Sequence, residues 1–265
     1  MVRLSLQLSP SSRKALPQVL PINYQYEVSA VIYRKLFDSN PEFAEWLHKE
    51  GLIHENRRFK FFTFSNLLIP QAHRKIKGDR IYIYGGDIRL IVSFAMKKGS
   101  DYFLAGLFDQ QRFTIGDQVS QAEFQVDSVT SLPVPGFSEF MRFRCLSPIC
   151  ISRTNHDKNG SRSTTYLSPE DPEFETRFVE NLQHKFESLP HGGALPEYDR
   201  ITVKPVSRPK SRLVSIKAGT PQETRVRGYL FEFDMHAPVP FMRLGYYAGF
   251  SEKNSTGFGC VEVKS

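Results

Sequence analysis

Residues 2–9, Val-Arg-Leu-Ser-Leu-Gln-Leu-Ser, alternate strictly between apolar and polar side chains. Apolar residues at every second position predict a β-strand with one face on a hydrophobic core. The predicted core residues are Val2, Leu4, Leu6 and Leu8. This pattern lacks the continuous apolar run of a signal peptide, so we expect the chain to begin with part of its fold.

An amphipathic helix is predicted next, from about Asn23, a suitable N-cap, to about Asp38. Its apolar side chains recur at helical spacing, and they are Tyr26, Val28, Ala30, Ile32, Tyr33, Leu36 and Phe37. Such a broad apolar stripe predicts packing against a sheet. Residues 40–42, Asn-Pro-Glu, then predict the start of a second, short helix, which Gly51 is placed to end.

The remaining elements of the first half complete a β-α-β-β-α-β order, which is typical of a ferredoxin-like domain. A strand, a hairpin broken at two glycines, a helix and further strands are predicted at residues 61–69, 80–95, 100–110 and 112–130. Residues 133–136, Pro-Val-Pro-Gly, are the best candidate for a linker at the end of this unit.

The same order of elements begins again after the linker, although the sequence itself does not repeat. A strand, a polar loop, a helix, three strands, a short helix and a final strand are predicted at residues 140–152, 155–162, 169–189, 200–206, 212–217, 225–234, 239–247 and 258–263. We therefore predict an α+β protein of two tandem ferredoxin-like (RRM-like, βαββαβ) domains, residues 1–132 and 137–265.

Composition excludes several classes of protein. The 265 residues are 40% hydrophobic and 24% charged, which is ordinary globular usage and excludes wholesale disorder. Three cysteines without a Cys-x-x-Cys pair fit neither a disulfide framework nor a zinc ribbon. No stretch approaches the roughly 18 apolar residues of a membrane span. We expect a cytoplasmic, soluble protein with no membrane partner.

The net charge of the chain, +7, is concentrated in residues 200–227. This segment has one acidic residue, Glu223, and eight basic residues, which are Arg200, Lys204, Arg208, Lys210, Arg212, Lys217, Arg225 and Arg227. The segment alone therefore carries a charge of +7, and the rest of the chain is neutral. Charge this concentrated on a predicted hairpin favours binding to a phosphate backbone. The alternative is an exposed edge strand that cations protect against aggregation.

Residues 249–259, Gly-Phe-Ser-Glu-Lys-Asn-Ser-Thr-Gly-Phe-Gly, form a glycine-rich loop near the C-terminus. The loop lacks the Gly-Lys-Ser/Thr ending of a P-loop, and it joins a helix to a strand, which is the reverse of the P-loop order. We expect a tight turn wedged between the two domains, with backbone amides and Lys253 available to an anionic ligand. A turn that binds nothing is the alternative.

The glycine-rich loop resembles that of the Cas6 family, the CRISPR-associated repeat-RNA endoribonucleases of the repeat-associated mysterious protein (RAMP) superfamily. The family pattern is Gly-x-Gly, five residues, then Gly-x-Gly. This chain matches the pattern at Gly249, Gly257 and Gly259, and Ser251 stands where a further glycine is usual.

The first third of the chain is also similar to this family. The resemblance involves Tyr33 in Val-Ile-Tyr-Arg, His48 in Trp-Leu-His-Lys and Lys60 in Phe-Lys-Phe-Phe-Thr-Phe-Ser. It implies two ferredoxin-like domains, in agreement with the order of elements. Residues 70–200 match the family only by that order.

The resemblance implies an endoribonuclease that cuts CRISPR repeat RNA within a long transcript (pre-crRNA) to release guide RNAs. It implies no metal and no cofactor. The ribose 2′-hydroxyl attacks the adjacent phosphate, which leaves a 2′,3′-cyclic phosphate and a 5′-hydroxyl. Family members commonly use a His, a Tyr and a Lys, which implies catalytic roles for His48, Tyr33 and Lys60. The residues expected to bind RNA are Arg57, Arg58, Lys204, Arg208, Lys210, Arg212, Lys217 and Lys253.

Elementary chemistry suits these three side chains. Histidine as a residue type titrates near neutrality, so His48 is the candidate acid or base. A lysine supplies positive charge to the phosphorane, which is the expected role of Lys60. A phenol with an ordinary pKa near 10 is a poor base, so Tyr33 is expected to orient the substrate by hydrogen bonding. A buried structural tyrosine, an exposed helix-end histidine and a solvated lysine are the corresponding structural interpretations.

Alternatives stay open within the site and for the whole protein. His54 could replace His48, and Arg57 and Arg58 could replace Lys60. The remaining histidines, which have no spaced partner to suggest a metal site, are His73, His156, His184, His191 and His236. The chain could instead be a non-cleaving RNA-binding subunit of a CRISPR effector complex, or a general tandem RNA-recognition protein, although it has no RNP-type aromatic motif. Other effector subunits and a second copy of the chain are open as protein partners.

Overall fold

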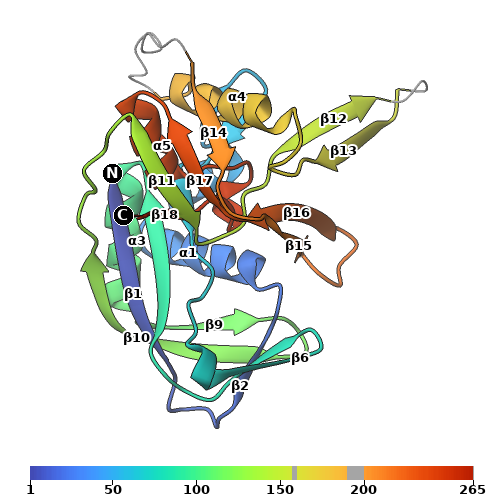
Figure 1. Ribbon diagram of the computed structural model, residues 1–265. Coiled ribbons are helices and arrows are strands. Elements are labelled where there is room, and N and C mark those ends of the chain that lie inside the picture. The colour runs from blue at the N-terminus through green and yellow to red at the C-terminus, as the bar shows by residue number, and fades with distance from the viewer. Residues whose placement is uncertain (157–159, 190–199, 265) are drawn as a thin grey trace.

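The computed structural model describes residues 1–156, 160–189 and 200–264. Two β-sheets with their helices make up the body of the molecule (Figure 1). The first sheet has the strand order β5-β8-β1-β10-β9, and all neighbours are antiparallel. Its strands are β1 (Val2–Pro10), β5 (Phe62–Phe64), β8 (Ile88–Phe94), β9 (Arg112–Gly116) and β10 (Gln121–Ser131).

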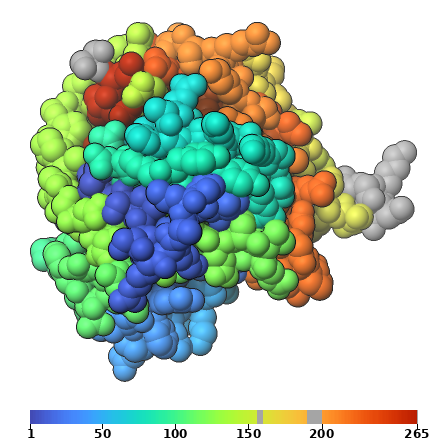
Figure 2. Space-filling view, turned by 90° about the horizontal axis from the view of Figure 1, so that it is seen from below, coloured from blue at the N-terminus to red at the C-terminus, as the bar shows by residue number. Residues whose placement is uncertain are grey.

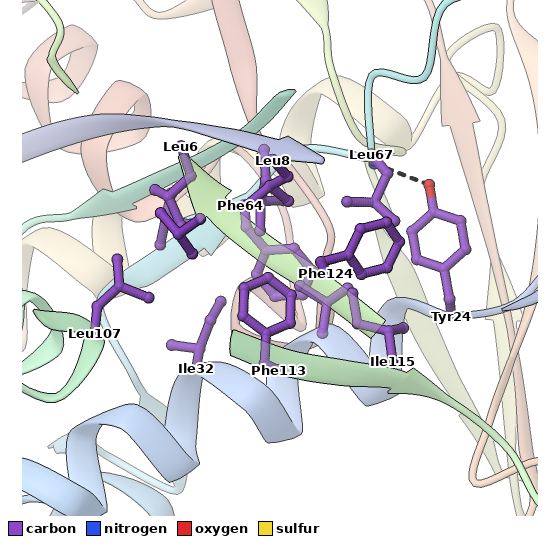
Figure 3. Packing of buried hydrophobic residues seen from close by; sticks show 14 of the residues in the cluster. Leu6, Leu8, Tyr24, Ile32, Phe64, Leu67, Leu107, Phe113, Ile115 and Phe124 are labelled. Carbon is purple, nitrogen blue, oxygen red and sulfur yellow. Dashed lines mark hydrogen bonds between the residues drawn. The ribbon is translucent and has the colours of Figure 1, made fainter. Parts of the chain in front are cut away.

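Helices α1 (Gln25–Ser39) and α3 (Lys97–Asp109) pack on this first sheet. Figure 3 shows Ile32 of α1 and Leu107 of α3 in one cluster with Leu6 and Leu8 of β1. The chain runs β1, α1, β5, β8, α3, β10, with β1 and β8 at the centre. This is the predicted ferredoxin-like arrangement.

The second sheet has the order β14-β17-β11-β18, again with antiparallel neighbours. Its strands are β11 (Phe140–Cys145), β14 (Thr202–Pro205), β17 (Glu232–His236) and β18 (Val261–Lys264). Helices α4 (Phe174–Glu187) and α5 (Val239–Ala248) share its hydrophobic core. When the four main strands of each sheet are numbered by their order along the chain, both sheets have the same spatial order: second, third, first and fourth. The predicted duplication of the fold is confirmed, and both cores are rich in Phe, of which sixteen of 22 are buried.

Several short strand pairs lie outside the two sheets. Hairpins β12–β13 and β15–β16 project from the same side of the body (Figure 1). Seen from below, the dark blue N-terminal segment lies beside the teal β6–β7 hairpin, because β2 pairs with β7 (Figure 2). The remaining elements are β2 (Gln18–Pro21), α2 (Pro41–Lys49), β3 (Leu52–His54), β4 (Arg57–Phe59), η1 (Gln71–His73), β6 (Arg74–Lys77), β7 (Arg80–Ile83), β12 (Ser152–His156), β13 (Arg162–Tyr166), β15 (Lys210–Ile216), β16 (Thr224–Leu230) and η2 (Asn254–Thr256).

Helix α1 differs from its prediction in its start and in its buried face. It begins at Gln25, so the predicted N-cap Asn23 is wrong; Tyr24 holds that position and makes no side-chain cap. The buried apolar residues of the helix are Val28, Ile32 and Leu36. Phe37, expected on the core stripe, is 49% exposed, because the sheet covers only one flank of that broad stripe.

Residues 80–95 do not form the predicted hairpin. β7 pairs with β2 and β6, whereas β8 pairs with β1 and β5. Gly85 and Gly86, both with positive φ, carry the chain from the small sheet to the large one. Periodicity predicts a strand but contains no information about its partner, which is why the pairing was wrong.

Other boundaries also shift. The predicted polar loop at 155–162 contributes to both strands of hairpin β12–β13, and segment 225–234 divides between β16 and β17, which belong to different sheets. Strand predictions 61–69, 140–152 and 258–263 shorten to β5, β11 and β18, helix 169–189 shortens to α4, and α3 begins at Lys97 instead of after Ser100.

Buried polar contacts join the two halves. Arg3 lies on the predicted polar face of β1, yet it is only 2% exposed. Its guanidinium donates hydrogen bonds to the backbone oxygens of Tyr246, at 3.0 Å, and Val261, and lies 4.2 Å from the centre of the Tyr246 ring. Thr63 of β5 donates a 2.9 Å hydrogen bond to the Phe258 oxygen. Part of the face expected to meet solvent therefore packs against the second half.

Membrane-spanning helices were not expected, and within the described residues no helix has the length and apolar character needed to cross a bilayer.

Candidate active site

Tyr33 on α1 and His48 on α2 meet because the two helices are joined by a tight turn. The predicted cap Asn40 begins α2, and its Oδ1 accepts a 2.8 Å hydrogen bond from the Phe43 amide. The turn brings the two rings to a centroid distance of 5.1 Å, edge to face at 85°. Tyr33 is partly buried, and His48 is exposed in the last turn of α2. The histidine is therefore open to a ligand while the tyrosine supports it.

The Tyr33 hydroxyl faces the glycine-rich loop. Burial raises the pKa of Tyr33 to about 12, and a hydrogen bond with the Ser255 side chain acts in the opposite direction. Ser29, one turn earlier on α1, donates a 2.6 Å hydrogen bond to the backbone oxygen of Ser255. Tyr33 thus stays protonated near neutral pH, which suits an orienting hydrogen-bond donor and not a base.

Lys60 follows β4 and lies against the end of α2. Its Nζ donates a 2.8 Å hydrogen bond to the backbone oxygen of His48. Burial lowers the pKa of Lys60 to about 8; nearby Arg58 lowers it too, and Glu50 acts in the opposite direction. The structure therefore brings Tyr33, His48 and Lys60 together, with an amine poised to change charge near neutral pH.

A cleft of about 530 Å³ opens beside Lys60, between hairpin β3–β4, helix α4 and the glycine-rich loop. Ser255, the partner of Tyr33, also lines it, so the cleft reaches Lys60 and the loop that contacts Tyr33. Tyr33 and His48 themselves line a separate hollow of about 370 Å³. Two acidic residues, Glu180 and Glu252, line the cleft. The seven basic residues that line it are Arg57, Arg58, Lys60, Arg153, Arg177, Lys185 and Lys253. This excess of cations suits a polyanion.

Three of the seven cleft cations, Arg153, Arg177 and Lys185, are not among the residues that the sequence predicted to bind RNA. They come from β12 and α4, far from the other cations in the sequence. Neither charge clustering nor a motif marks them, because they reach the cleft only through the packing of the two halves. No pattern in the sequence therefore predicts that these three residues line the cleft.

Lys185 anchors the glycine-rich loop from α4. The residue is buried, and its Nζ donates hydrogen bonds of 2.7 Å to the Gly249 oxygen and 2.6 Å to the Ser251 oxygen. Burial lowers the pKa of Lys185 to about 7, and the charge of Glu252 acts in the opposite direction. A lysine whose ammonium is desolvated but held by two carbonyls fixes the path of the loop.

Ser251, which stands in place of the usual glycine, has its own anchoring role. It is 1% exposed, and its hydroxyl accepts a 2.7 Å hydrogen bond from the Cys150 amide and donates one of 2.9 Å to the Cys150 oxygen. The departure from the family pattern therefore satisfies two buried backbone groups instead of disturbing the loop.

Most amides of the loop are engaged within the protein. The residues whose amides donate to backbone oxygens are Gly249, Phe250, Glu252, Thr256, Gly257 and Gly259. The expectation that backbone amides of the loop are available to a ligand is therefore wrong at these positions. The loop instead presents the exposed Lys253, in the left-handed conformation at φ +53°, to the cleft.

Replacing Lys185 by methionine is expected to flatten the pH dependence of stability. The folded-state pKa is about 7 against an ordinary 10.5, so the unfolded chain binds more protons between these values. The free energy of unfolding therefore rises through this group as pH increases from about 7 to 10.5, and the variant lacks that rise. Urea unfolding of both proteins at about pH 7 and pH 9 measures it. Lys204→Met removes an exposed lysine as a control; equal slopes in all three proteins would contradict the assignment.

The predicted phosphate-binding residues of the second half lie on a different surface. Arg212 of β15 lines a second hollow of about 760 Å³ together with Arg74, Arg89 and Arg144. The other predicted residues, all exposed on β14, on β15 or in the flanking turns, are Lys204, Arg208, Lys210 and Lys217. The sequence thus predicted a basic surface, but one that is separate from the cleft beside Lys60.

The structure places His54 beside His184, whereas His48 is the histidine in ring contact with Tyr33. His54 ends β3 and lies against α4, where its Nε2 is 3.2 Å from Glu187 Oε2. Of the other histidines, His191 lies outside the described residues, and His184 is the one that contacts His54.

The tandem ferredoxin-like fold, the glycine-rich loop and the basic cleft together define a protein of the RAMP class. Models of the N-terminal and C-terminal regions of CRISPR-associated protein Cas6 match residues 19–130 and 132–263. The chain belongs to the Cas6 family.

Relatives span nearly the whole chain. A CRISPR-associated endoribonuclease Cas6 of Methanocaldococcus jannaschii is 29% identical over 243 residues, which cover 92% of this chain and 87% of the relative. The corresponding enzyme of Pyrococcus furiosus is 25% identical over 263 residues, 99% and 90% of the two chains. Among solved structures, a RAMP protein described as binding different RNA substrates has a TM-score of 0.82 at 25% identity, with both chains covered completely at 100%.

Proposed function

We propose that this chain is a metal-independent endoribonuclease that binds CRISPR repeat RNA and cleaves pre-crRNA within the repeat. The observation that carries the proposal is the contact of Tyr33 with His48 and of His48 with Lys60, which lines a basic cleft. The Cas6 relatives are named endoribonucleases, and this chain covers 87% and 90% of their lengths. Cleavage leaves a 2′,3′-cyclic phosphate and a 5′-hydroxyl.

The three residues divide the work of the reaction. His48, exposed and at the end of α2, exchanges a proton with the 2′-hydroxyl or the 5′-oxygen. Lys60 in its protonated form stabilises the charge that develops on the phosphate. Tyr33, held protonated by burial, donates a hydrogen bond that orients the phosphate or His48. Arg57, Arg58, Arg153, Arg177 and Lys253 of the cleft hold the RNA backbone, whereas Lys185 is buried and anchors the loop.

The test is to incubate the purified protein with its host's CRISPR repeat RNA in excess EDTA and to map the product ends. A single cut with a 2′,3′-cyclic phosphate and a 5′-hydroxyl is expected. Tight, salt-sensitive binding without a cut would instead assign the chain to the non-cleaving RNA-binding subunits of effector complexes. If the protein neither cut nor bound the repeat RNA, the proposed function would be refuted.

The cleavage rate is expected to fall as pH rises through about 8, because Lys60 loses its proton there. Tyr33, with a pKa of about 12, contributes no change in this range. Single-turnover rates between about pH 6 and pH 9.5 measure the effect, and Lys60→Arg should keep the charge and remove the decline. A rate that increases through pH 8 would make Lys60 the base and contradict its role as a cation.

Replacing Arg208, Lys210 and Arg212 together is expected to reduce the salt dependence of RNA binding. Each lost phosphate contact lowers the slope of log K against log salt by roughly 0.7–0.9. Binding titrations at several salt concentrations measure the slope. Glu223→Gln, on the same hairpin, is the control, because it removes no contact with phosphate. An unchanged slope in the triple variant would exclude the hairpin from the RNA interface.

The finer organisation is also part of the proposal. Residues 1–132 and 137–265 form the two domains, which is supported by the separate sheets on either side of segment 132–139. Three free cysteines suit the reducing cytoplasm. A second copy of the chain is one protein partner in the proposal, and other CRISPR effector subunits are the alternative. Size-exclusion chromatography of the purified chain with and without product RNA tests for the second copy.

A further inference from the structure

Two histidines and a glutamate from opposite halves meet beside the cleft. His54 ends β3, and His184 and Glu187 lie one turn apart on α4. Glu187 Oε2 lies 3.2 Å from His54 Nε2 and 3.6 Å from His184 Nδ1, and the three ligand atoms all lie within 4.8 Å of one another. The imidazole ring centres are 5.3 Å apart. The two histidines are partly buried and Glu187 is exposed, with side-chain exposures of 28% for His54, 21% for His184 and 33% for Glu187.

We propose that His54, His184 and Glu187 form a binding site for a divalent transition metal, with Zn²⁺ as the best-fitting ion. Zinc bonds to nitrogen and oxygen of about 2.0–2.2 Å in a tetrahedron place ligand atoms roughly 3.3–3.5 Å apart. The two measured separations to Glu187 bracket that value, so modest side-chain rotation would complete the set. Two imidazoles and one carboxylate leave a fourth position for water.

The local chemistry favours a metal over a simple ion pair. His184 Nδ1 is buried and has no hydrogen-bond partner among the described residues, so none of them satisfies its lone pair or proton. A metal ion would satisfy it together with the other two ligand atoms. Imidazole nitrogens select zinc, cobalt, nickel or copper over the hard cation Mg²⁺, which requires oxygen ligands.

The location gives the metal a structural role. β3 belongs to the hairpin whose second strand begins with Arg57 and Arg58, and α4 contains Arg177; all three line the cleft. A metal that joins β3 to α4 would therefore clamp the two walls of the cleft. No sequence spacing marks a metal-binding partner for His184, because His54 lies 130 residues away in the chain.

The experiment uses the full chain, stripped of metal with EDTA and then desalted. Titration with CoCl₂ is expected to produce visible d–d absorption that saturates at one equivalent and is displaced by ZnCl₂. ZnCl₂ at about 100 times its dissociation constant should raise the midpoint of thermal unfolding by roughly 5–10 °C, whereas MgCl₂ should not. These readouts are independent of cleavage, which is tested in excess EDTA, so one proposal can fail without the other.

Variants identify the ligands. His54→Ala and Glu187→Gln should each weaken Co²⁺ binding by at least roughly 100-fold and abolish the Zn²⁺-dependent stabilisation. His236→Ala, an exposed histidine on β17, should behave like the wild type. Absence of the cobalt spectrum in the wild type, or the same spectrum and stabilisation in His54→Ala, would overturn the proposal. Partly exposed side chains at both positions keep the variants folded, which circular dichroism verifies.

Discussion

Replacing His48 by alanine is expected to slow cleavage of repeat RNA by about 10²–10⁴-fold while RNA affinity stays close to that of the wild type. The expected decrease in rate corresponds to the loss of general acid–base catalysis by a positioned histidine. Folding should be unaffected, because His48 is exposed in the last turn of α2 and the Asn40 cap that begins this helix is untouched. Single-turnover cleavage under saturating protein measures the rate, and filter binding measures the affinity.

The matched control is His236→Ala, which removes an exposed histidine at the C-terminal end of β17, an inner strand of the second sheet. It should cleave at the wild-type rate. Tyr33→Phe should have a smaller effect than His48→Ala, because it removes only the hydroxyl and retains the ring that contacts His48. Full cleavage by His48→Ala would remove the catalytic assignment and direct attention to Lys60, whose pKa of about 8 also permits proton transfer.

Replacing Gly259 by alanine is expected to destabilise the protein by about 2–5 kcal/mol. Gly259 has φ +79°, in the left-handed region, where an L side chain is strained. An added Cβ would lie 2.5 Å from Ser251 Cβ and 2.6 Å from Asn254 Nδ2. Both neighbours are buried and hydrogen-bonded, so neither moves without breaking the contacts that hold the loop. The midpoint of thermal unfolding should fall by roughly 5–15 °C.

The control for the backbone term is Gly78→Ala. Gly78 also has positive φ, +58°, but no atom of the described residues lies within 4 Å of its added Cβ. The Gly78→Ala variant should therefore lose only the roughly 1–2 kcal/mol of stability that the left-handed conformation costs an L residue. Equal losses in the two variants would mean that packing of the loop contributes little. RNA binding by Gly259→Ala at a temperature where it is folded should also weaken, because Lys253 depends on the same loop for its position.

Local patterns predicted the local features. The alternation in residues 2–9 predicted β1, and the Asn40-Pro41 pair predicted the start of α2, because each depends on side chains close in sequence. The predicted N-cap Asn23 was wrong. The helix begins at Gln25, so Tyr24 is the N-cap, and no local signal distinguished Tyr24 from Asn23. The hairpin at 80–95 was wrong because strand pairing depends on the other sheet strands, β1, β2, β5 and β6.

The candidate site was predictable in its members but not in its surroundings. Resemblance to a family indicated Tyr33, His48 and Lys60, and a charge count indicated a basic segment at 200–227. The count did not separate that segment from the cleft, and it missed Arg153 and Arg177. Charges scattered through a sequence form one surface only when the chain folds.

The amino-acid sequence by itself determined the α+β class, the order of elements and the tight turn between α1 and α2, because these depend on periodicity and capping within a few residues. Only the tertiary structure decided how the halves meet. Arg3 became buried, Lys185 and Ser251 became anchors of the loop, and His54 came to lie against His184 and Glu187. Each of these contacts joins residues that are at least 64 positions apart in the chain, and the contacts of Arg3 span 243 positions or more. Such pairs depend on how the two sheets pack, which no local pattern specifies.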